Sequence, residues 1–475
     1  MIPQPRSTVP AAQHRIVAAG VFLFAATFAL RYPGYISFDA NLQLEQARAG
    51  IYNDWHPPIM AVLWSGLQRW GAAGPTMLAF QVAGHWIGFT AMADGLARIG
   101  RRRSAWVMLA SGASPLLLFY LGVIYKDVGL GSTLIAAFGI AFWFRVQARS
   151  VPLLAGCAAS ILLVYATLVR VNAVFAFGAI LVYVFGTPRR SGNVALLVTA
   201  SVLAVIALPA SNFVNHSILR ARPSGVEQTL QLFDLTGIAA RSGDRSVLPP
   251  SVHLSTSQIA NCYTPQYWDP LGMAVCDYAF KQLPAPGTQA RKAVTDAWIA
   301  GIVRHPLSYA AHRLAVYNAL LNWWVPALQC RDAPFDASCG TPDPRTGRML
   351  ETAANQRLIR WDYIKKNPLV WPATWLAVGL CLFALQWNDA PSSTSAASRA
   401  LLASALIYAL AYLLVGVAAD IRYFYWPIVA IQSALILEGR RLHARIRERD
   451  PIVLACLGIV ALVIALGYVA RMIYP

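Results

Sequence analysis

Long apolar runs separated by short polar segments dominate the pattern of this 475-residue chain. Many of these runs reach about 18 residues, the length that crosses a bilayer as an α-helix. The pattern predicts about eleven spanning helices, at 16–35, 76–97, 104–123, 128–146, 152–169, 173–187, 193–213, 368–387, 399–419, 423–438 and 451–471. We therefore expect an all-α polytopic membrane protein.

Two apolar segments depart from this pattern. Ile59–Trp70 is only about a dozen residues long, so we expect a juxtamembrane helix there. A spanning helix at His305–Val325 would bury His312 and Arg313 and would reverse the orientation of every later helix. For this segment we expect an interfacial helix, anchored by its two tryptophans.

Composition and charge support a membrane protein and give it an orientation. Hydrophobic residues make up 57% of the chain and charged residues 13%, a balance that excludes an ordinary soluble domain. The net charge of +18 comes largely from arginines in the short loops 98–103, 145–149, 188–190 and 439–450. By the positive-inside rule these loops and the N-terminus are cytoplasmic, so the basic charge does not require nucleic acid. No cleavage site follows the first apolar run, which we expect to be retained as a helix.

This orientation divides the chain into three parts. Residues 1–213 form an N-terminal transmembrane module with an outside loop at 36–74, and residues 368–475 form the C-terminal transmembrane helices. Between them, 214–367 is rich in proline, glycine, serine and aromatic residues without comparable apolar runs. We expect this stretch to be a folded extracytoplasmic domain, α or α+β.

Cysteine positions agree with that orientation. Cys157, Cys381 and Cys456 lie in predicted spans, where packing is the simplest role. The remaining four lie in the outside stretch, where an oxidising compartment favours two disulfides. Three connectivities exist, and we prefer Cys262–Cys276 with Cys330–Cys339 because each closes a short loop. Zinc binding is the rival interpretation, but the chain lacks the C-x-x-C spacing that it usually needs here.

Polar residues gather where four outside loops meet the predicted helices. They are Asp39, Asp54 and His56, then Lys126 and Asp127, then Arg170 and Asn172, and finally Asp420, Arg422 and Tyr423. Ionisable groups at this depth are expensive and are usually functional. The alternative is that they are snorkelling side chains and ion pairs that tie helix ends together, for example Asp420 with Arg422. Four separate loops placing such groups on one face favour a shared site.

The residue types indicate a chemistry for that site. Lys126, Arg170 and Arg422 suit an anionic headgroup, where arginine offers a planar fork and lysine a point charge. Asp39 suits proton abstraction from a hydroxyl, or the holding of a divalent cation against a phosphate. Together these residues describe transfer from a membrane-borne phosphate donor to a hydroxyl or amine. Asp54 and His56 could orient Asp39 or the acceptor.

One order of motifs resembles a known family. An acidic residue, Asp39, follows the first helix, then comes an amphipathic segment at Gln43–Gly50, and then Asp54-Trp55-His56-Pro57-Pro58. In this order, and in Lys126-Asp127 and Arg422 further on, the chain resembles the GT-C superfamily of polytopic glycosyltransferases, which includes protein O-mannosyltransferases and the aminoarabinose–lipid A transferase. The resemblance covers 16–175 and 411–430, but not 214–367. Ala40 stands where many relatives carry a second acid, so a paired-acid metal site is not implied and a divalent cation stays an open question.

The resemblance implies an inverting transfer from a polyprenyl-phosphate-linked sugar to a lipid, glycan or protein acceptor, on the outer face of a bacterial inner membrane. It implies Asp39 as general base, Asp127 as secondary acid, and Lys126 and Arg422 at the donor phosphate. From their residue types and positions we also expect Arg170 and Tyr423 at the donor phosphate, and His56 and Asp54 as supporting groups. A transporter or flippase for lipid-linked saccharides is the main alternative, although it would favour internal repeats and mid-membrane charges. A phosphoethanolamine or acyl transferase is a third option. The sequence does not indicate the sugar or the acceptor.

Overall fold

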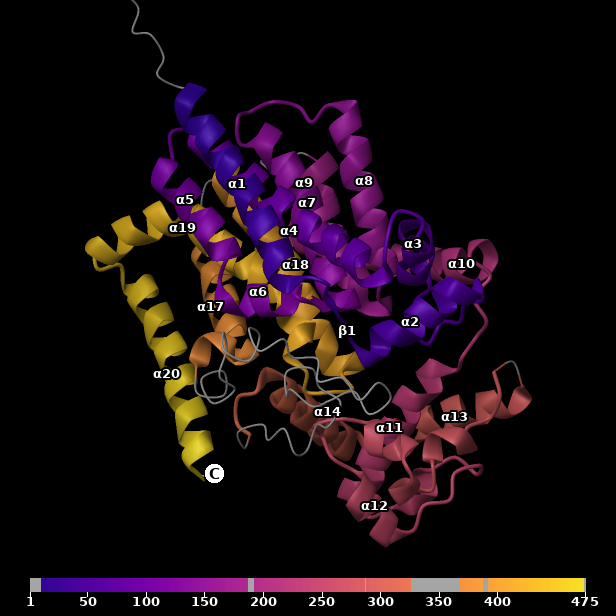
Figure 1. Cartoon of the computed structure of the whole chain (residues 1–475). Helices are drawn as coiled ribbons and strands as arrows, with labels where there is room; N and C mark the ends of the chain where they lie inside the picture. The colour runs from indigo at the N-terminus through magenta and orange to yellow at the C-terminus, as the bar shows by residue number, and fades with distance from the viewer. Residues whose placement is uncertain (1–9, 187–191, 287, 326–366, 388–391, 474–475) are drawn as a thin grey trace, which may run out of the picture.

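The computed structural model describes residues 10–186, 192–286, 288–325, 367–387 and 392–473, which are predominantly helical. Most helices lie in one bundle (Figure 1), namely α1 (Pro10–Arg31), α4 (Ala73–Arg98), α5 (Arg102–Gly112), α6 (Pro115–Leu121), α7 (Lys126–Arg145), α8 (Leu153–Leu168), α9 (Val174–Phe185), α10 (Asn193–Phe213), α17 (Pro372–Leu385), α18 (Ser393–Val415), α19 (Tyr425–Arg447) and α20 (Pro451–Ile473). A second group lies at one end of it, namely α11 (Val226–Ser242), α12 (Thr256–Cys262), α13 (Gln289–Arg304) and α14 (Pro306–Leu321). The short helices α2 (Phe38–Ala49) and α3 (Ile59–Leu67) lie beside the bundle near this end.

All eleven apolar stretches singled out in the sequence contain helix. Within the described residues, five helices are long and apolar enough to cross a membrane, or six if the bent pair α5 and α6 is one span. This pair bends by 48° where Pro115 begins α6, because proline cannot continue the preceding helix. Helix α10 runs on through a π-helical turn to Ile218, so the boundary expected at 213 falls inside a continuous helical segment.

Helix α7 is the centre of the bundle. Within the described chain, 83% of its apolar window is buried, against 11% for α20, which stands at the edge of the bundle in Figure 1. Helix α4 packs against α7 at very short range, since a Cβ added to Gly88 would lie 2.5 Å from the carbonyl oxygen of Ile135. Glycine at this position therefore permits the close approach of the two helices.

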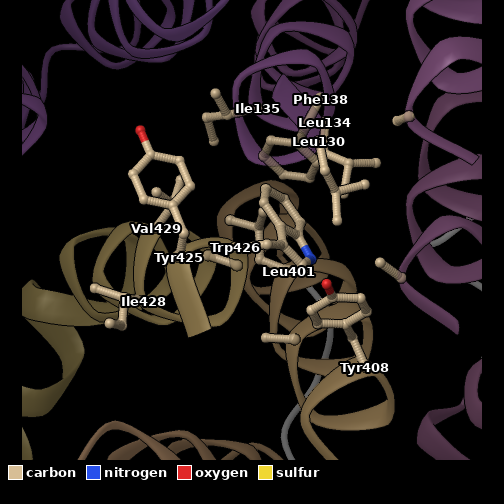
Figure 2. Packing of buried hydrophobic residues seen from close by; sticks show 14 of the residues in the cluster. Leu130, Leu134, Ile135, Phe138, Leu401, Tyr408, Tyr425, Trp426, Ile428 and Val429 are labelled. Atoms are coloured by element: carbon tan, nitrogen blue, oxygen red, sulfur yellow. The ribbon is translucent and has the colours of Figure 1, made fainter. Parts of the chain in front are cut away.

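A cluster of large side chains joins the beginnings of α7 and α19. Figure 2 shows Tyr425 and Trp426 of α19 beside Leu130 and Phe138 of α7 and near residues of α18. The indole Nε1 of Trp426 donates a 3.0 Å hydrogen bond to the hydroxyl oxygen of Ser404 in α18. This packing holds the beginning of α7, which carries Lys126, against the beginning of α19, which follows Arg422.

A two-stranded parallel sheet, which the sequence pattern did not predict, connects two distant segments. Its strands β1 (Tyr35–Ile36) and β2 (Val123–Ile124) directly precede the beginnings of α2 and α7. Ser37 donates a 3.2 Å hydrogen bond to the Ile124 carbonyl and also caps α2 by accepting from the Ala40 amide. The sheet thus brings the first turn of α2 next to the first turn of α7.

The helices α11 to α14 enclose a second hydrophobic core, separate from that of the bundle. Its residues include Phe233, Ile238 and Ile259, together with the disulfide Cys262–Cys276, which is the first of the two expected pairs. Cys330 and Cys339 lie outside the described residues. In 214–286 and 288–325 the regular structure is helical, consistent with the α form of the expected domain.

The segment expected as an interfacial helix forms α14, which begins at Pro306 and packs against α11 and α18. His312 and Arg313 are buried in it, because both pair with the buried carboxylate of Asp234. Arg313 also donates a 2.8 Å hydrogen bond to the carbonyl of Gly416 at the end of α18. Protein partners rather than lipid headgroups therefore satisfy these polar groups.

Candidate functional site

Asp39 and Arg422 meet at the end of the bundle that faces the second group of helices. The Arg422 Nη2 lies 3.1 Å from the Asp39 Oδ2, and the His56 Nε2 lies 3.8 Å from the Asp39 Oδ1. On its other side, the His56 ring accepts at Nδ1 from the ammonium of Lys126, 2.7 Å away. Four residues that are far apart in the sequence are thus in one cluster.

Asp127 and Asp420 extend the cluster around the two arginines. Arg170 forms an ion pair with Asp127 and donates a 3.1 Å hydrogen bond from Nε to the side-chain oxygen of Asn172. The Arg422 Nε lies 2.7 Å from Asp420 and 3.9 Å from Asp127. The ion pair of Asp420 with Arg422 is therefore present, as expected if such pairs only tie helix ends together. Arg422, however, also contacts Asp39 and Asp127.

Tyrosine rings line the two arginines. The guanidinium of Arg170 lies 4.5 Å from the ring centre of Tyr423, and that of Arg422 lies 4.4 Å from the ring centre of Tyr125. Tyr423 in turn stacks on Tyr412 of α18, with ring centres 5.2 Å apart. These cation–π contacts hold both guanidinium planes in fixed orientations. Tyr423 was predicted at the site, whereas Tyr125 and Tyr412 were missed.

The charges in the cluster set the protonation of its two loop residues. Burial alone would raise the pKa of Asp39, but the positive charges nearby, Arg422 foremost, hold it well below its usual range. Burial, reinforced by the charge of Lys126, lowers the pKa of His56 to about 3. Asp39 is therefore ionised and His56 neutral at pH 7, which agrees with a His56 Nδ1 that accepts from Lys126.

Several buried polar atoms at the site have no hydrogen-bond partner within the described part of the chain. They include two donors, the Nε2 of His56, which lies 3.8 Å from Asp39, and the Nδ2 of Asn172, beside Arg170. Buried donors are normally paired, so unpaired ones beside three cations are suited to donate to the oxygen atoms of an anionic or hydroxylated ligand.

Asp54 lies outside this cluster. Its carboxylate accepts a 2.5 Å hydrogen bond from the Ser224 amide and lies 3.4 Å from the His216 Nε2. Its own amide donates to the carbonyl of Arg222. Asp54 therefore anchors the outside loop to the segment after α10, and the structure does not bring it to Asp39 as the sequence interpretation expected.

Asp269 is a further acidic residue near the site that the sequence analysis missed. Its segment pairs with the loop before Arg422, since the Trp268 amide donates to the Val417 carbonyl and the Ala419 amide donates to the Gln266 carbonyl. The desolvating protein surroundings raise the pKa of Asp269, and the charge of Asp39 raises it further. Asp269 is nevertheless an exposed residue and so remains open to solvent. No motif distinguishes it within the long outside stretch.

The surroundings of Asp39 are cationic. The guanidinium of Arg422 pairs with its carboxylate, and the ammonium of Lys126 adds a second positive charge. These charges repel a divalent cation at Asp39. In the ranges that the structure describes, no group of three or more His, Cys, Asp or Glu side chains is arranged to hold a metal ion.

Comparisons with family models, with curated proteins and with solved structures gave no match for this chain.

Proposed function

We propose that this protein is a polytopic membrane glycosyltransferase of the GT-C type, which moves a sugar from a polyprenyl-phosphate-linked donor to a hydroxyl or amine of a lipid, glycan or protein. The observation that carries the proposal is the convergence of Asp39 with Lys126, Arg170 and Arg422, from four loops, beside unpaired donors. A phosphate needs such cations, and an attacking hydroxyl needs such a carboxylate.

The proposed topology has about eleven spans, a cytoplasmic N-terminus, and the site with 214–367 on the outer face of a bacterial inner membrane. The broad apolar surfaces of α1, α10 and α20 support membrane insertion, because each is less than a quarter buried in its apolar window. The arginine-rich loops 98–103, 145–149 and 439–450, at the end of the bundle away from the site, support the orientation.

The donor phosphate would bind between Lys126, Arg170 and Arg422. In the structure these three cations face three carboxylates, Asp39, Asp127 and Asp420. A phosphate that binds Arg422 would replace its contact with Asp39, which would leave that carboxylate free for the acceptor. Tyr125 and Tyr423 would keep the guanidinium planes oriented for bidentate contacts.

In the transfer step, the acceptor oxygen or nitrogen attacks the anomeric carbon of the donor sugar from the face opposite the phosphate. The new bond forms as the bond from that carbon to the phosphate oxygen breaks, and its electron pair stays on the polyprenyl phosphate. The acceptor proton passes to the carboxylate of Asp39. The cations stabilise the charge that grows on the leaving phosphate, and His56 holds Lys126 in place.

The transporter alternative has less support. The charged residues of the cluster lie in loops or in first helical turns, with Asp39 opening α2 and Asp127 opening α7. Transporters place such groups near the bilayer midplane.

The affinity for undecaprenyl phosphate tests the proposal. Full-length protein in lipid nanodiscs should bind this lipid, and Arg422→Ala should weaken binding by roughly 10- to 100-fold, as expected for the loss of a charge-assisted contact. Arg445→Ala is the matched control, because Arg445 pairs with Asp450 at the opposite end of the bundle. Equal affinities for the wild type and Arg422→Ala would contradict the proposed donor site.

A further inference from the structure

We infer that Trp55, Trp268 and Asp269 form a subsite for a pyranose ring, beside the cations that would bind the donor phosphate. The inference rests on the proposed function for the identity of the neighbouring phosphate. The three residues come from two separate parts of the chain, namely the outside loop after α2 and the disulfide-linked segment after α12.

The two indole rings meet across the boundary between the bundle and the second group of helices. Their ring centres are 6.3 Å apart and the rings are tilted by 35°. Phe280 packs edge-on against Trp268 at 5.6 Å and supports it from within the second group. Trp55 keeps 36% of its surface exposed, so the pair retains an accessible aromatic face.

The segment that carries Trp268 and Asp269 is held firmly in place. Tyr267 forms a bridge with Ala418, flanked by the two backbone hydrogen bonds to Val417 and from Ala419. Arg422 stands three positions after Ala419 in the chain. The aromatic pair and Asp269 are therefore fixed relative to Arg422, which is what a binding site needs for a rigid ligand.

The chemistry of these residues fits a sugar. A pyranose ring presents C–H groups on its faces, which stack on indole rings, and hydroxyls at its edge, which donate to a carboxylate. Asp269 remains exposed to solvent while its charge interacts with those of Asp39 and Arg422. A sugar joined to phosphate through one oxygen must lie directly beside the phosphate-binding cation, and this subsite provides a surface for it there.

The ring at this subsite could belong to the donor or to a saccharide acceptor, and two sets of probes separate these sources. The first set is undecaprenyl phosphate, either free or carrying glucose, mannose, galactose or 4-amino-4-deoxyarabinose. The second set is the methyl glycosides of the same four sugars. Binding is measured with full-length protein in lipid nanodiscs, for the wild type, Asp269→Asn and Trp55→Leu. Trp70→Leu is the matched control, since Trp70 is 87% exposed and lies beyond α3.

For a donor subsite, both variants should weaken the binding of at least one sugar-bearing lipid by about tenfold and leave sugar-free undecaprenyl phosphate within about twofold. For an acceptor subsite, the same loss should appear with a methyl glycoside. Trp70→Leu should change neither. Equal weakening of sugar-bearing and sugar-free probes, or no weakening of any sugar, would overturn the inference. If Arg422→Ala leaves lipid binding intact while Asp269→Asn still weakens a methyl glycoside, the proposed function fails and the subsite stands.

Discussion

The two ends of the helical bundle use charged residues in different ways. At the end away from the site, two ion pairs within the described residues are local, since Arg98 pairs with Asp94 four residues earlier and Arg445 pairs with Asp450 five residues later. At the site end, Arg422 pairs with Asp39, which stands 383 positions earlier in the chain. Local ion pairs form within or next to one helix end, whereas a distant ion pair forms only when the fold brings two segments together.

Buried polar atoms without a hydrogen-bond partner in the described chain occur at both ends, for example the Oδ1 of Asp94 and the Nε2 of His56. The site end differs in the charges that surround such an atom. His56 lies between the carboxylate of Asp39 and the ammonium of Lys126, and Arg422 is shared among three carboxylates. Shared buried charges of this kind are typical of functional sites.

The largest expected effect comes from removing the proposed base at the site end. Asp39→Asn should reduce sugar transfer by about 10²- to 10⁴-fold, because the amide cannot take the acceptor proton. Transfer is measured from radiolabelled polyprenyl-phosphate sugars to membrane material. Asp450→Asn, at the other end, should transfer normally, and near-normal transfer by Asp39→Asn would remove the proposed base.

The second effect concerns stability and compares one arginine from each end. Arg170→Ala should destabilise the protein by about 3–5 kcal/mol, because it leaves the buried carboxylate of Asp127 with only the more distant Arg422, 3.9 Å away. Arg445→Ala removes a partly exposed pair and should cost about 1 kcal/mol or less. Thermal unfolding in nanodiscs gives both values, and equal losses would show that the two ends do not differ in this respect.

The smallest effect is a pH dependence that arises from His56. Its pKa in the folded protein is lowered to about 3, so the unfolded chain binds the extra proton between that pH and the ordinary value near 6.5. Stability should therefore fall as pH falls through this window, and His56 should account for about 2 kcal/mol of the loss between pH 7 and pH 5.

His56→Gln, which cannot be protonated but keeps an acceptor for Lys126, should show a correspondingly smaller loss. His443, in the basic segment at the other end, supplies the control His443→Gln. Identical pH profiles for the wild type and His56→Gln would contradict a neutral buried imidazole.

The positions of the helices could be predicted from the sequence, because a helix that crosses a bilayer needs a run of about 18 apolar residues. The sequence pattern did not predict the bend at Pro115 or the extension of α10 to Ile218. A proline or a further helical turn changes where a helix ends but leaves the pattern of apolar residues unchanged. From the sequence, Asp39, Lys126 and Arg422 could be placed on one face of the protein, because their loops alternate along the chain with the arginine-rich loops. Their actual contacts depend on the short sheet β1–β2, which two residues per strand cannot signal.

The errors at the site also have physical reasons. Asp54 stands only two residues from His56, but its carboxylate turns to the Ser224 amide, and sequence proximity does not reveal such a direction. Asp269 lies far from every motif and reaches the site through backbone pairing with residues 417–419. Contacts between distant segments determine both positions, and a single sequence carries no direct record of those contacts.

The central claim is that a lipid phosphate binds among the cations that surround Asp39. A cryo-electron microscopy structure of the full-length protein in nanodiscs with undecaprenyl phosphate tests this most directly. We predict phosphate density within hydrogen-bond distance of Arg422 and of Lys126 or Arg170, with the contact between Arg422 and Asp39 broken. Phosphate density elsewhere on the protein, with that ion pair intact, would contradict the account.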